Sequence, residues 1–217
     1  MIDRRTMIAG GAALAAMPMG LKAALPVPPG NRLGFDIMRK ETKLGTHVLT
    51  FEPSGDMLTV RVVVDLTFKL AGITLYRYRH QATERWQGDR VMALDTQTDA
   101  NGTPWQMSAR REGAALMVQA TKTPRFAAPA DAMPATHWNH RELETPWINM
   151  QDGKILRPTV SARGIEAIPD AGGGLIRARH YALTGDVQLD MFYDDRLGWA
   201  GLSFTKGGAL VRYERQG

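Results

Sequence analysis

Cysteine is absent from the 217 residues of this chain. A protein without thiols forms no disulfide, binds no iron–sulfur cluster or thiolate-ligated metal, and has no cysteine nucleophile. Long apolar runs are also lacking, because no segment reaches the ~20 apolar residues that a membrane-spanning helix requires. We find neither an internal repeat nor a low-complexity segment. What remains is a chain of the right length for one ordinary domain with its own apolar core.

The chain also lacks a strong excess of charge. It has 27 basic and 22 acidic residues, and the net charge is +5. Residues 1–24 contain three basic residues and one acidic residue, so 24 and 21 remain after them, with a net charge of +3. The basic residues are scattered along the sequence, which argues against a nucleic-acid partner. Nothing in the composition indicates a cofactor, and we expect none.

The N-terminus carries the clearest signal in the sequence. Arg4 and Arg5 precede a weakly apolar run from Ala9 to Met19, and Lys22 follows that run. Paired arginines before such a run resemble a twin-arginine export leader, which is recognised by machinery that transports folded proteins. We therefore expect residues 1–24 to be this leader, the export machinery to be a partner, and the protein to work in the periplasm. The cleavage site is not defined, so a retained leader that anchors the protein is an alternative.

After the leader, the proline-rich segment 25–31 predicts a stiff, extended linker. From residue 32 onward, apolar and polar residues alternate with a period of two, which is typical of β-strands. The clearest case is 57–70, where Leu58, Val60, Val62, Val64, Leu66, Phe68 and Leu70 share one face. A strand of this length, about 43 Å, has to coil, and it therefore predicts a strongly curved sheet or a barrel.

Turn sequences rich in glycine, asparagine and aspartate separate further candidate strands at short spacing. The predicted strands are 34–41, 46–52, 57–70, 73–86, 90–98, 103–111, 114–121, 159–168, 174–182, 187–194, 198–205 and 209–215. Four prolines interrupt this rhythm at 124–146, which predicts a long loop with a helical turn near 139–143. The predicted fold is all-β: a single domain, 32–217, with a long curved antiparallel meander of about a dozen strands. The meander forms an open or closed barrel, the loop serves as its lid, and the leader is helical.

The aromatic hairpins of this meander resemble those of a known family. The motifs are Tyr76-Arg77-Tyr78-Arg79-His80, Glu84-Arg85-Trp86 and Leu197-Gly198-Trp199. From Gly34 to Tyr213 the chain resembles an uncharacterised family of exported bacterial β-rich domains of unknown function. The resemblance implies a fold broadly similar to the open barrels of envelope proteins that hold lipids or lipoprotein acyl chains. It implies no activity, because a shared architecture does not fix function.

The strand 73–86 carries the most unusual set of side chains. Its even positions include Tyr76, Tyr78, His80, Glu84 and Trp86 on one face. As ligand-binding residues, the aromatic side chains would form apolar walls. His80 and Glu84 would then supply polar contacts, or act as a general base and the group that orients it. Along a strand these two lie about 13 Å apart, so a ligand or water would have to lie between them. The alternative is a solvated aromatic face with cross-strand packing.

The loop 124–146 carries a second candidate site. His137 and His140 have the spacing at which two histidines on a helical turn share a metal ion, and Glu142 or Glu144 could add an oxygen ligand. Trp138 lies between the two histidines, and we expect it to contact a ligand under the lid. The simpler alternative is a lid packed by Trp138 and Trp147, with exposed histidines.

Three functions are consistent with these features. The leading hypothesis is a non-enzymatic carrier or binding module for a lipid or another hydrophobic or amphipathic small molecule. The second is a periplasmic hydrolase or lyase that uses His80 with Glu84, or His137 with His140. The third is a protein-interaction module that docks through a sheet edge. The sequence alone leaves open whether the protein is an enzyme.

Overall fold

A computed structural model of the chain describes residues 25–217. The predicted leader, with Arg4, Arg5 and its helix, lies outside the described residues. No helix within residues 25–217 combines the length and the apolar character needed to cross a membrane.

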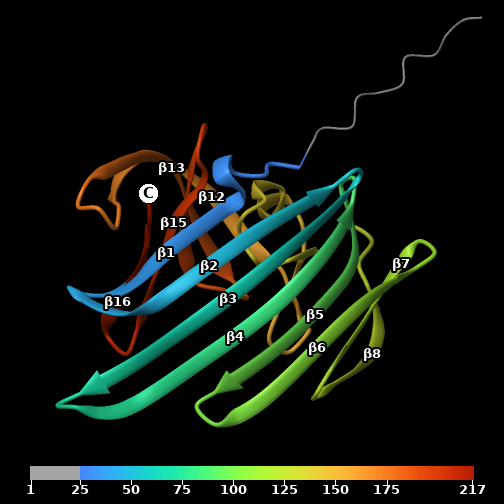
Figure 1. Cartoon of the computed structure of the whole chain (residues 1–217), viewed down its shortest axis with the longest axis horizontal. Helices are drawn as coiled ribbons and strands as arrows, with labels where there is room; N and C mark the ends of the chain where they lie inside the picture. Colours follow the sequence, from blue (N-terminus) through green and yellow to red (C-terminus); the bar gives the residue numbers. More distant parts are fainter. Residues whose placement is uncertain (1–24) are drawn as a thin grey trace, which may run out of the picture.

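Thirteen strands form one continuous antiparallel sheet (Figure 1). The first strand, β1 (Arg32–Arg39), pairs with both β2 (Thr42–Ser54) and β16 (Ala209–Arg215), so the sheet extends from β1 in two directions. One edge of the sheet is β8 (Thr123–Ala128) and the other is β12 (Pro158–Pro169). The described strands include no ladder between these two edges, so the sheet is not closed.

The remaining strands of the sheet follow one another through short turns. They are β3 (Met57–Leu70), β4 (Ile73–Gln87), β5 (Arg90–Ala100), β6 (Thr103–Glu112), β7 (Ala115–Ala120), β13 (Leu175–Gly185), β14 (Leu189–Asp194) and β15 (Gly198–Lys206). The predicted all-β meander is therefore confirmed, while the closed form of the barrel is wrong. The predicted loop 124–146 is wrong at its start, where β8 forms although proline is its second residue; β8 is an edge strand, where proline is tolerated.

The sheet curves because its strands are long and interrupted by bulges. One bulge is at Leu75 of β4, which has no partner where Phe68 and Lys69 of β3 pair with Tyr76 and Thr74, and others interrupt the ladders of β1 and β12. Bulges increase the local twist of a strand. The close approach of β2 to β3 at one end of their ladder also depends on Gly45, since a Cβ there would overlap the carbonyl oxygen of Asp65. The long strands can therefore coil around a common interior.

Alternating apolar side chains of the strands face this interior. Phe35 and Ile37 of β1, Leu49 of β2 and Val60 of β3 have no exposed surface. The stretch predicted as a linker also contributes to the core. Leu25 and Val27 pack against it, and the 3-10 turn η1 (Pro29–Asn31) leads into β1. The described part of this stretch therefore lies against the domain instead of extending away from it.

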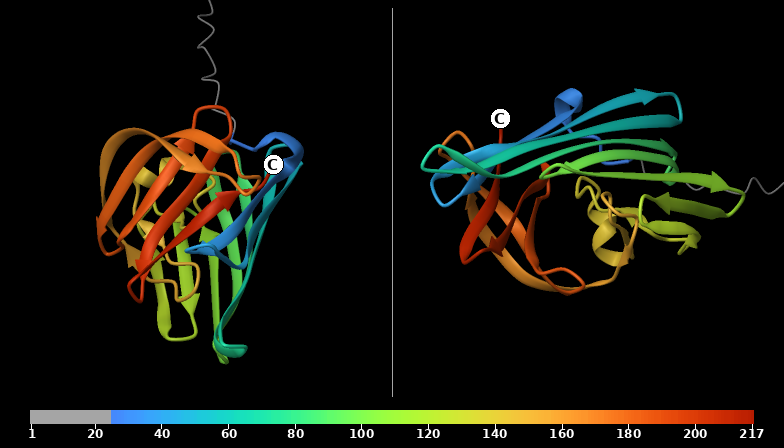
Figure 2. Two further views of the ribbon diagram at one scale, coloured as in Figure 1. Left: turned by 90° about the vertical axis from the view of Figure 1, so that its left-hand side faces the viewer. Right: turned by 90° about the horizontal axis from the view of Figure 1, so that it is seen from below.

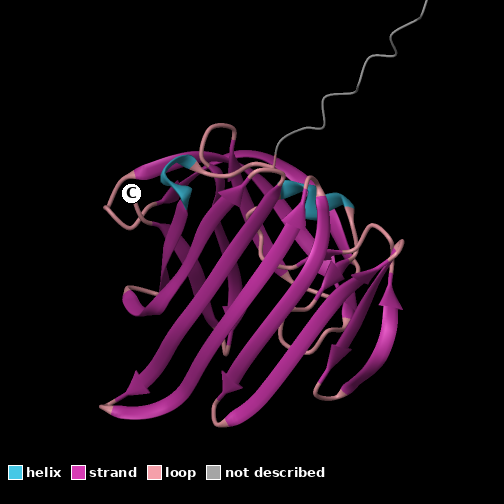
Figure 3. Ribbon diagram, turned by 45° about the vertical axis from the view of Figure 1, so that its right-hand side comes forward, coloured by secondary structure: helices cyan, strands magenta, loops and turns pink. Residues whose placement is uncertain are grey.

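The segment between β8 and β12, residues 129–157, lies on the concave side of the sheet, as the right-hand view of Figure 2 shows. We call it the interior segment. It contains three two-residue strands, β9 (Met133–Pro134), β10 (Trp147–Ile148) and β11 (Ile155–Leu156), and the 3-10 turn η2 (His140–Glu144) (Figure 3). The helical turn predicted near 139–143 is therefore present.

The interior segment is buried, so its predicted role as a lid over a barrel mouth is wrong. Trp138, Trp147 and Ile148 are at most 2% exposed and belong to the main core. An open sheet of this curvature leaves an apolar concave face uncovered, and these side chains cover it. The hydroxyl of Thr123 in β8 donates to the carbonyl of Asp152, which ties the interior segment to one sheet edge.

Candidate functional site

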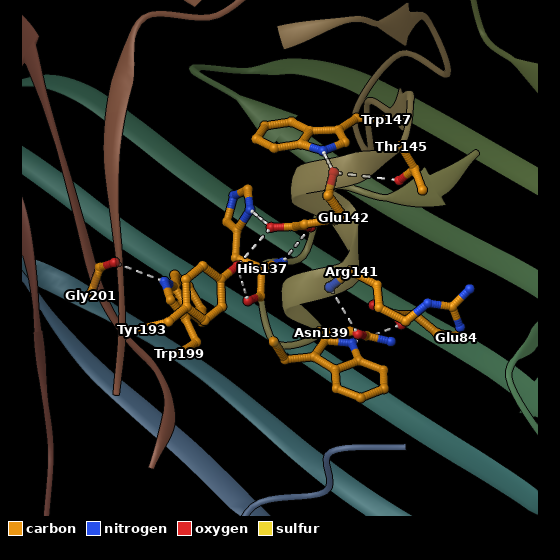
Figure 4. A network of polar contacts seen from close by, with 11 residues as sticks. Glu84, His137, Asn139, Arg141, Glu142, Thr145, Trp147, Tyr193, Trp199 and Gly201 are labelled. Carbon is orange, nitrogen blue, oxygen red and sulfur yellow. Dashed lines mark hydrogen bonds and ion pairs between the residues drawn. The ribbon is translucent and has the colours of Figure 1, made fainter. Parts of the chain in front are cut away.

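A buried carboxylate on β4 fixes the interior segment to the sheet (Figure 4). Glu84 has no exposed surface, and its Oε2 accepts hydrogen bonds from the indole nitrogens of Trp86, at 2.8 Å, and Trp138, at 3.1 Å. Its Oε1 has no hydrogen-bond partner among the described residues. Burial raises the pKa of Glu84 to about 7, against 4.5 for an ordinary glutamate. Glu84 therefore joins strand and segment as an anchor.

A second carboxylate, within the interior segment, forms the other anchor. The Oε1 of Glu142 accepts from His137 Nδ1 at 2.7 Å and from the hydroxyl of Tyr193 at 3.2 Å, and its Oε2 accepts from the His137 backbone N–H. The Tyr193 hydroxyl also lies 2.8 Å from the His137 carbonyl oxygen, and Trp147 donates to the Glu142 carbonyl. Burial and the nearby Glu142 raise the pKa of Tyr193 well above 10. This network holds His137 in a left-handed conformation with φ 69°.

The sheet and the interior segment also line a cavity of about 280 Å³ that is partly open to the solvent, with His137 in its wall. Aliphatic side chains supply much of its wall: Val62, Val64, Leu66, Leu156, Val187, Leu189 and Leu202. The polar groups of the wall are Tyr78, Thr136, Asn149, Gln151, Tyr213 and three histidines. Within residues 25–217, no Asp, Glu, Lys or Arg lines this cavity.

Three histidines from separate elements meet at the cavity: His47 of β2, His80 of β4 and His137 of the interior segment. His80 Nδ1 forms a hydrogen bond of 2.7 Å with the Thr98 hydroxyl. Burial lowers the pKa of His80 to about 4. The pKa of His47 falls further, to about 3, because of its burial and the proximity of His137 and His80. Both His47 and His80 are therefore neutral at pH 7.

His47 is the least satisfied polar side chain of the site. Its ring is 6% exposed, and neither ring nitrogen has a hydrogen-bond partner among the described residues. It packs beside Trp199 and Tyr213, with ring centroids 5.3 and 5.7 Å apart. A neutral imidazole has one donor and one acceptor, and leaving both unpaired in a buried position is costly. The ring therefore has unused hydrogen-bonding capacity, and His47 belongs to the wall of the cavity.

The structure separates the residues that the sequence analysis grouped on one strand face. Tyr78 and His80 line the cavity, whereas Glu84 and Trp86 lie outside its wall, buried with Trp138. Tyr76 is 39% exposed, near the tip of the β3–β4 hairpin. The predicted ligand-binding set, Tyr76, Tyr78, His80, Glu84, Trp86 and Trp138, thus divides into two cavity residues, three buried core residues and one exposed residue. As a catalytic pair, His80 and Glu84 have separate partners, Thr98 for the first and two indoles for the second.

The predicted metal pair is also divided. His137 lines the cavity and is bound to Glu142, whereas His140 is exposed at the start of η2. Within residues 25–217, no three His, Cys, Asp or Glu side chains converge as metal ligands. The arrangement of His137 with Glu142 is therefore that of a structural hydrogen bond within the interior segment.

The sequence analysis missed His47. It occupies the inward-facing register of β2 together with Leu49 and Phe51, where a lone histidine interrupts an apolar face. That interruption was a usable signal. Glu142 was considered only as a metal ligand, and its contact with Tyr193, 51 positions away, could not be read from local spacing.

A larger groove, of about 620 Å³, lies on the outer face of β4 to β7, away from the histidines. Its lining includes the exposed side chains of Gln81, Gln97, Gln106 and Gln119. It is the twisted, solvated surface of the sheet, and among the described residues its one buried, unpaired polar group is the Thr96 hydroxyl. It has neither the aliphatic wall nor the histidines of the interior cavity. The interior cavity is therefore the better candidate for a binding site.

One prediction concerns the ionisation of Glu84, the anchor on β4. Because the pKa of Glu84 is raised from 4.5 to about 7, the folded protein binds more protons than the unfolded chain between these pH values. The free energy of unfolding should therefore fall by about 3 kcal/mol as the pH rises from 4.5 to 7 through this group. Glu84→Gln keeps an oxygen for the two indoles and cannot ionise, so it should gain about 3 kcal/mol over wild type across this range. Urea unfolding at pH 4.5 and 7.5 measures this.

The matched control for this prediction is Glu144→Gln, the same change at an exposed position of η2. It should leave the pH dependence of the wild type unchanged. A difference between Glu84→Gln and wild type that is the same at both pH values would contradict the raised pKa.

The open sheet wrapped around a buried segment defines the domain as β-barrel-like. A solved structure of similar architecture is the crystal structure of a β-barrel-like protein of domain of unknown function DUF1849 from Brucella abortus. The TM-score is 0.58 and the sequence identity 13%, with 89% of this chain and 98% of that chain covered. At this identity the similarity shows the fold alone.

The family follows from the sequence. The family model described as Domain of unknown function (DUF6134) matches residues 35–216, and the chain belongs to this family. A search of the curated proteins finds no match. The predicted resemblance to a β-rich family of unknown function is thereby confirmed, while export and lipid binding stay predictions.

Proposed function

We propose that the domain is a non-enzymatic carrier or binding module that holds an uncharged amphipathic small molecule in the interior cavity. The observation that carries this proposal is His47, a buried imidazole without a hydrogen-bond partner among the described residues, in the wall of a largely aliphatic cavity. A ligand group that donates to or accepts from this ring would offset the cost of its burial. The aliphatic wall would hold the apolar part of the ligand.

The charge of the wall supports an uncharged ligand. With no acidic or basic side chain at the cavity among the described residues, and with His47 and His80 neutral at pH 7, an ionised ligand would lose its hydration without gaining a counter-charge. A volume of about 280 Å³ is just below the ~300–1,000 Å³ usual for drug-sized ligands. One short acyl chain or one small ring system with a hydroxyl, carbonyl or aromatic amine group meets these conditions.

The proposed place of action is the periplasm, reached through the twin-arginine machinery. The support for this is the leader-like sequence around Arg4 and Arg5, followed by a body without cysteine. In this setting the domain would bind its ligand between the membranes. The enzyme hypothesis has less support, because His80 and Glu84 are engaged with separate partners.

The test uses protein purified from the periplasm and the neutral fluorescent probe N-phenyl-1-naphthylamine, which has an apolar ring system and one N–H donor. We expect saturable, stoichiometric binding, and an affinity at least roughly tenfold lower in His47→Phe. Phenylalanine keeps the aromatic contacts with Trp199 and Tyr213 but removes both ring nitrogens. The anionic probe 1-anilinonaphthalene-8-sulfonate should bind at least roughly tenfold more weakly than the neutral probe.

His140→Gln is the matched control, because it removes an exposed histidine that does not line the cavity. This variant should bind the probe as wild type does. Native mass spectrometry before and after mild organic extraction gives an independent readout of a bound molecule. The proposal fails if the wild-type protein binds no neutral probe, or if the two variants lose affinity equally.

A further inference from the structure

The hairpin of β3 and β4 extends beyond its neighbours as a two-stranded ribbon. The last residue of β3 that pairs with β2 is Leu66, and the first residue of β4 that pairs with β5 is Tyr78. Past this pair, the strand pairing of residues 67–77 is only with each other, while the backbone of Arg77 also bonds to Asn101 of the β5–β6 turn. Figure 1 shows the hairpin projecting at the lower left. The ribbon turns at Ala71 and Gly72, both with positive φ, as in the tight turns of two-residue hairpins.

Apolar side chains are exposed at the tip of this ribbon. Ile73 is 67% exposed, Leu75 49% and Tyr76 39%, and these three are consecutive or nearly consecutive in the chain. Exposed apolar side chains that occur singly need no explanation, but a cluster on a projecting tip marks an interaction surface. We call Ile73, Leu75 and Tyr76 the apolar tip.

Basic side chains surround the apolar tip. Lys69 and Arg77 lie on the ribbon itself, are exposed, and have no salt-bridge partner in the described part of the chain. Arg39 of β1 stacks on the ring of Phe68, 4.7 Å from its centroid. Two nearby carboxylates are paired with other arginines, Asp65 with Arg79 and Glu41 with Arg212. Asp99, opposite Arg79 on β5, accepts a hydrogen bond from the Gly102 backbone N–H. The ribbon therefore carries two exposed basic side chains, Lys69 and Arg77, that make no ion pair within the described residues.

The ribbon also continues the wall of the interior cavity. Leu66 and Tyr78 are cross-strand partners and both line the cavity. The next inward-facing pair towards the tip is Phe68 with Tyr76. Val187 and Leu189, at the β13–β14 turn, line the cavity at the same end of the sheet. The apolar tip thus lies beside the end of the cavity at which these residues meet.

We propose that the β3–β4 ribbon docks on the surface of an anionic lipid bilayer, with the apolar tip in the headgroup region and the basic side chains against the lipid phosphates. An apolar insertion or a basic patch alone binds a bilayer only weakly, and the two together give stable, reversible attachment. Tyrosine is a residue type that favours the interface. The transfer of a lipid-derived ligand from the docked ribbon to the cavity would rest on the proposed function. The docking itself is independent of that function.

The experiment is co-sedimentation of the protein, purified from the periplasm with its N-terminus determined, with vesicles of phosphatidylglycerol and phosphatidylethanolamine. We expect Ile73→Ser with Leu75→Ser to weaken binding at least roughly tenfold, and Lys69→Glu with Arg77→Glu to weaken it similarly. The matched control is Ile165→Ser with Leu175→Ser, since these side chains are 62% and 72% exposed on the other edge of the molecule. This control should bind within roughly twofold of wild type.

The outcomes are distinct. The proposal is overturned if the tip variant, Ile73→Ser with Leu75→Ser, binds vesicles as tightly as wild type. It is also overturned if the tip variant and the control variant lose vesicle affinity equally. Concentration-dependent self-association that disappears in the tip variant, without binding to vesicles, overturns it in favour of a second copy of the chain. Binding of N-phenyl-1-naphthylamine without vesicles should be unchanged in the tip variant. If neither wild type nor any variant binds the probe, the proposed function of the cavity is refuted, while the result on vesicle binding still stands.

Discussion

Replacement of Trp138 with alanine is expected to lower the free energy of unfolding by about 4 kcal/mol, the largest effect of any single change considered for this domain. Trp138 is 2% exposed and packs edge-on against Trp86 and Phe51, with centroids 5.4 and 5.3 Å apart. The substitution leaves a void in the core and removes one of the two indole donors to buried Glu84. Urea unfolding at pH 7, followed by circular dichroism, measures the loss.

Two further variants separate the contribution of the hydrogen bond to Glu84 from that of the buried ring. Trp138→Phe retains most of the ring volume and removes only the donor. It should cost about 1–2 kcal/mol, between a hydrogen bond to a neutral group and one to a charged group, because Glu84 is about half ionised at pH 7. Trp105→Ala changes a half-buried tryptophan that is stacked with Lys122, and it should cost less than about 1 kcal/mol. If Trp138→Ala cost no more than Trp105→Ala, the interior segment would not be held as described.

The strands could be predicted because their signal is local. The alternation from Leu58 to Phe68 places one residue type on each face, and the bounds of β3 agree with the predicted 57–70. The glycine-rich turns set the remaining hairpins in the same way. The interior segment could not be placed by such reasoning, because proline suppresses strand signals equally in a surface loop and in a buried segment. Its position depends on which surface needs covering, and that follows only from the curvature of the whole sheet.

Part of the site could be predicted because alternation along a strand is also a local signal. Tyr78 and His80 face inward by simple alternation, so the sequence placed them on the correct face of β4. That face continues to Glu84, where the interior segment fills the space that the cavity occupies further along. The change from cavity to core along one strand depends on contacts with Trp138, 54 residues away in the chain. His47 reaches the site from β2. This strand pairs with β1 and β3 and is not a neighbour of β4 in the sheet, so the meeting of His47 and His80 does not follow from strand pairing alone.

Acid should destabilise the domain through His47. The unfolded chain takes up a proton at this residue near pH 6.5, whereas the folded protein does so only near pH 3, because of burial and the neighbouring histidines. Between these values the unfolded state binds more protons, so the free energy of unfolding falls as the pH falls. From pH 7 to pH 3.5 the loss from this group is about 4 kcal/mol. His80 acts in the same direction down to about pH 4, and Glu84 opposes both between pH 7 and 4.5.

Comparison with His47→Phe isolates this contribution, because the other titrating groups are common to both proteins. The difference in the free energy of unfolding between variant and wild type should move by about 4 kcal/mol in favour of the variant between pH 7 and pH 3.5. Denaturant titrations at half-unit pH steps give the curve. The exposed His140, changed to glutamine, should show no such trend. A flat difference for His47→Phe would mean that the imidazole is hydrated in the folded protein, and the same result would remove the unpaired ring on which the binding proposal depends.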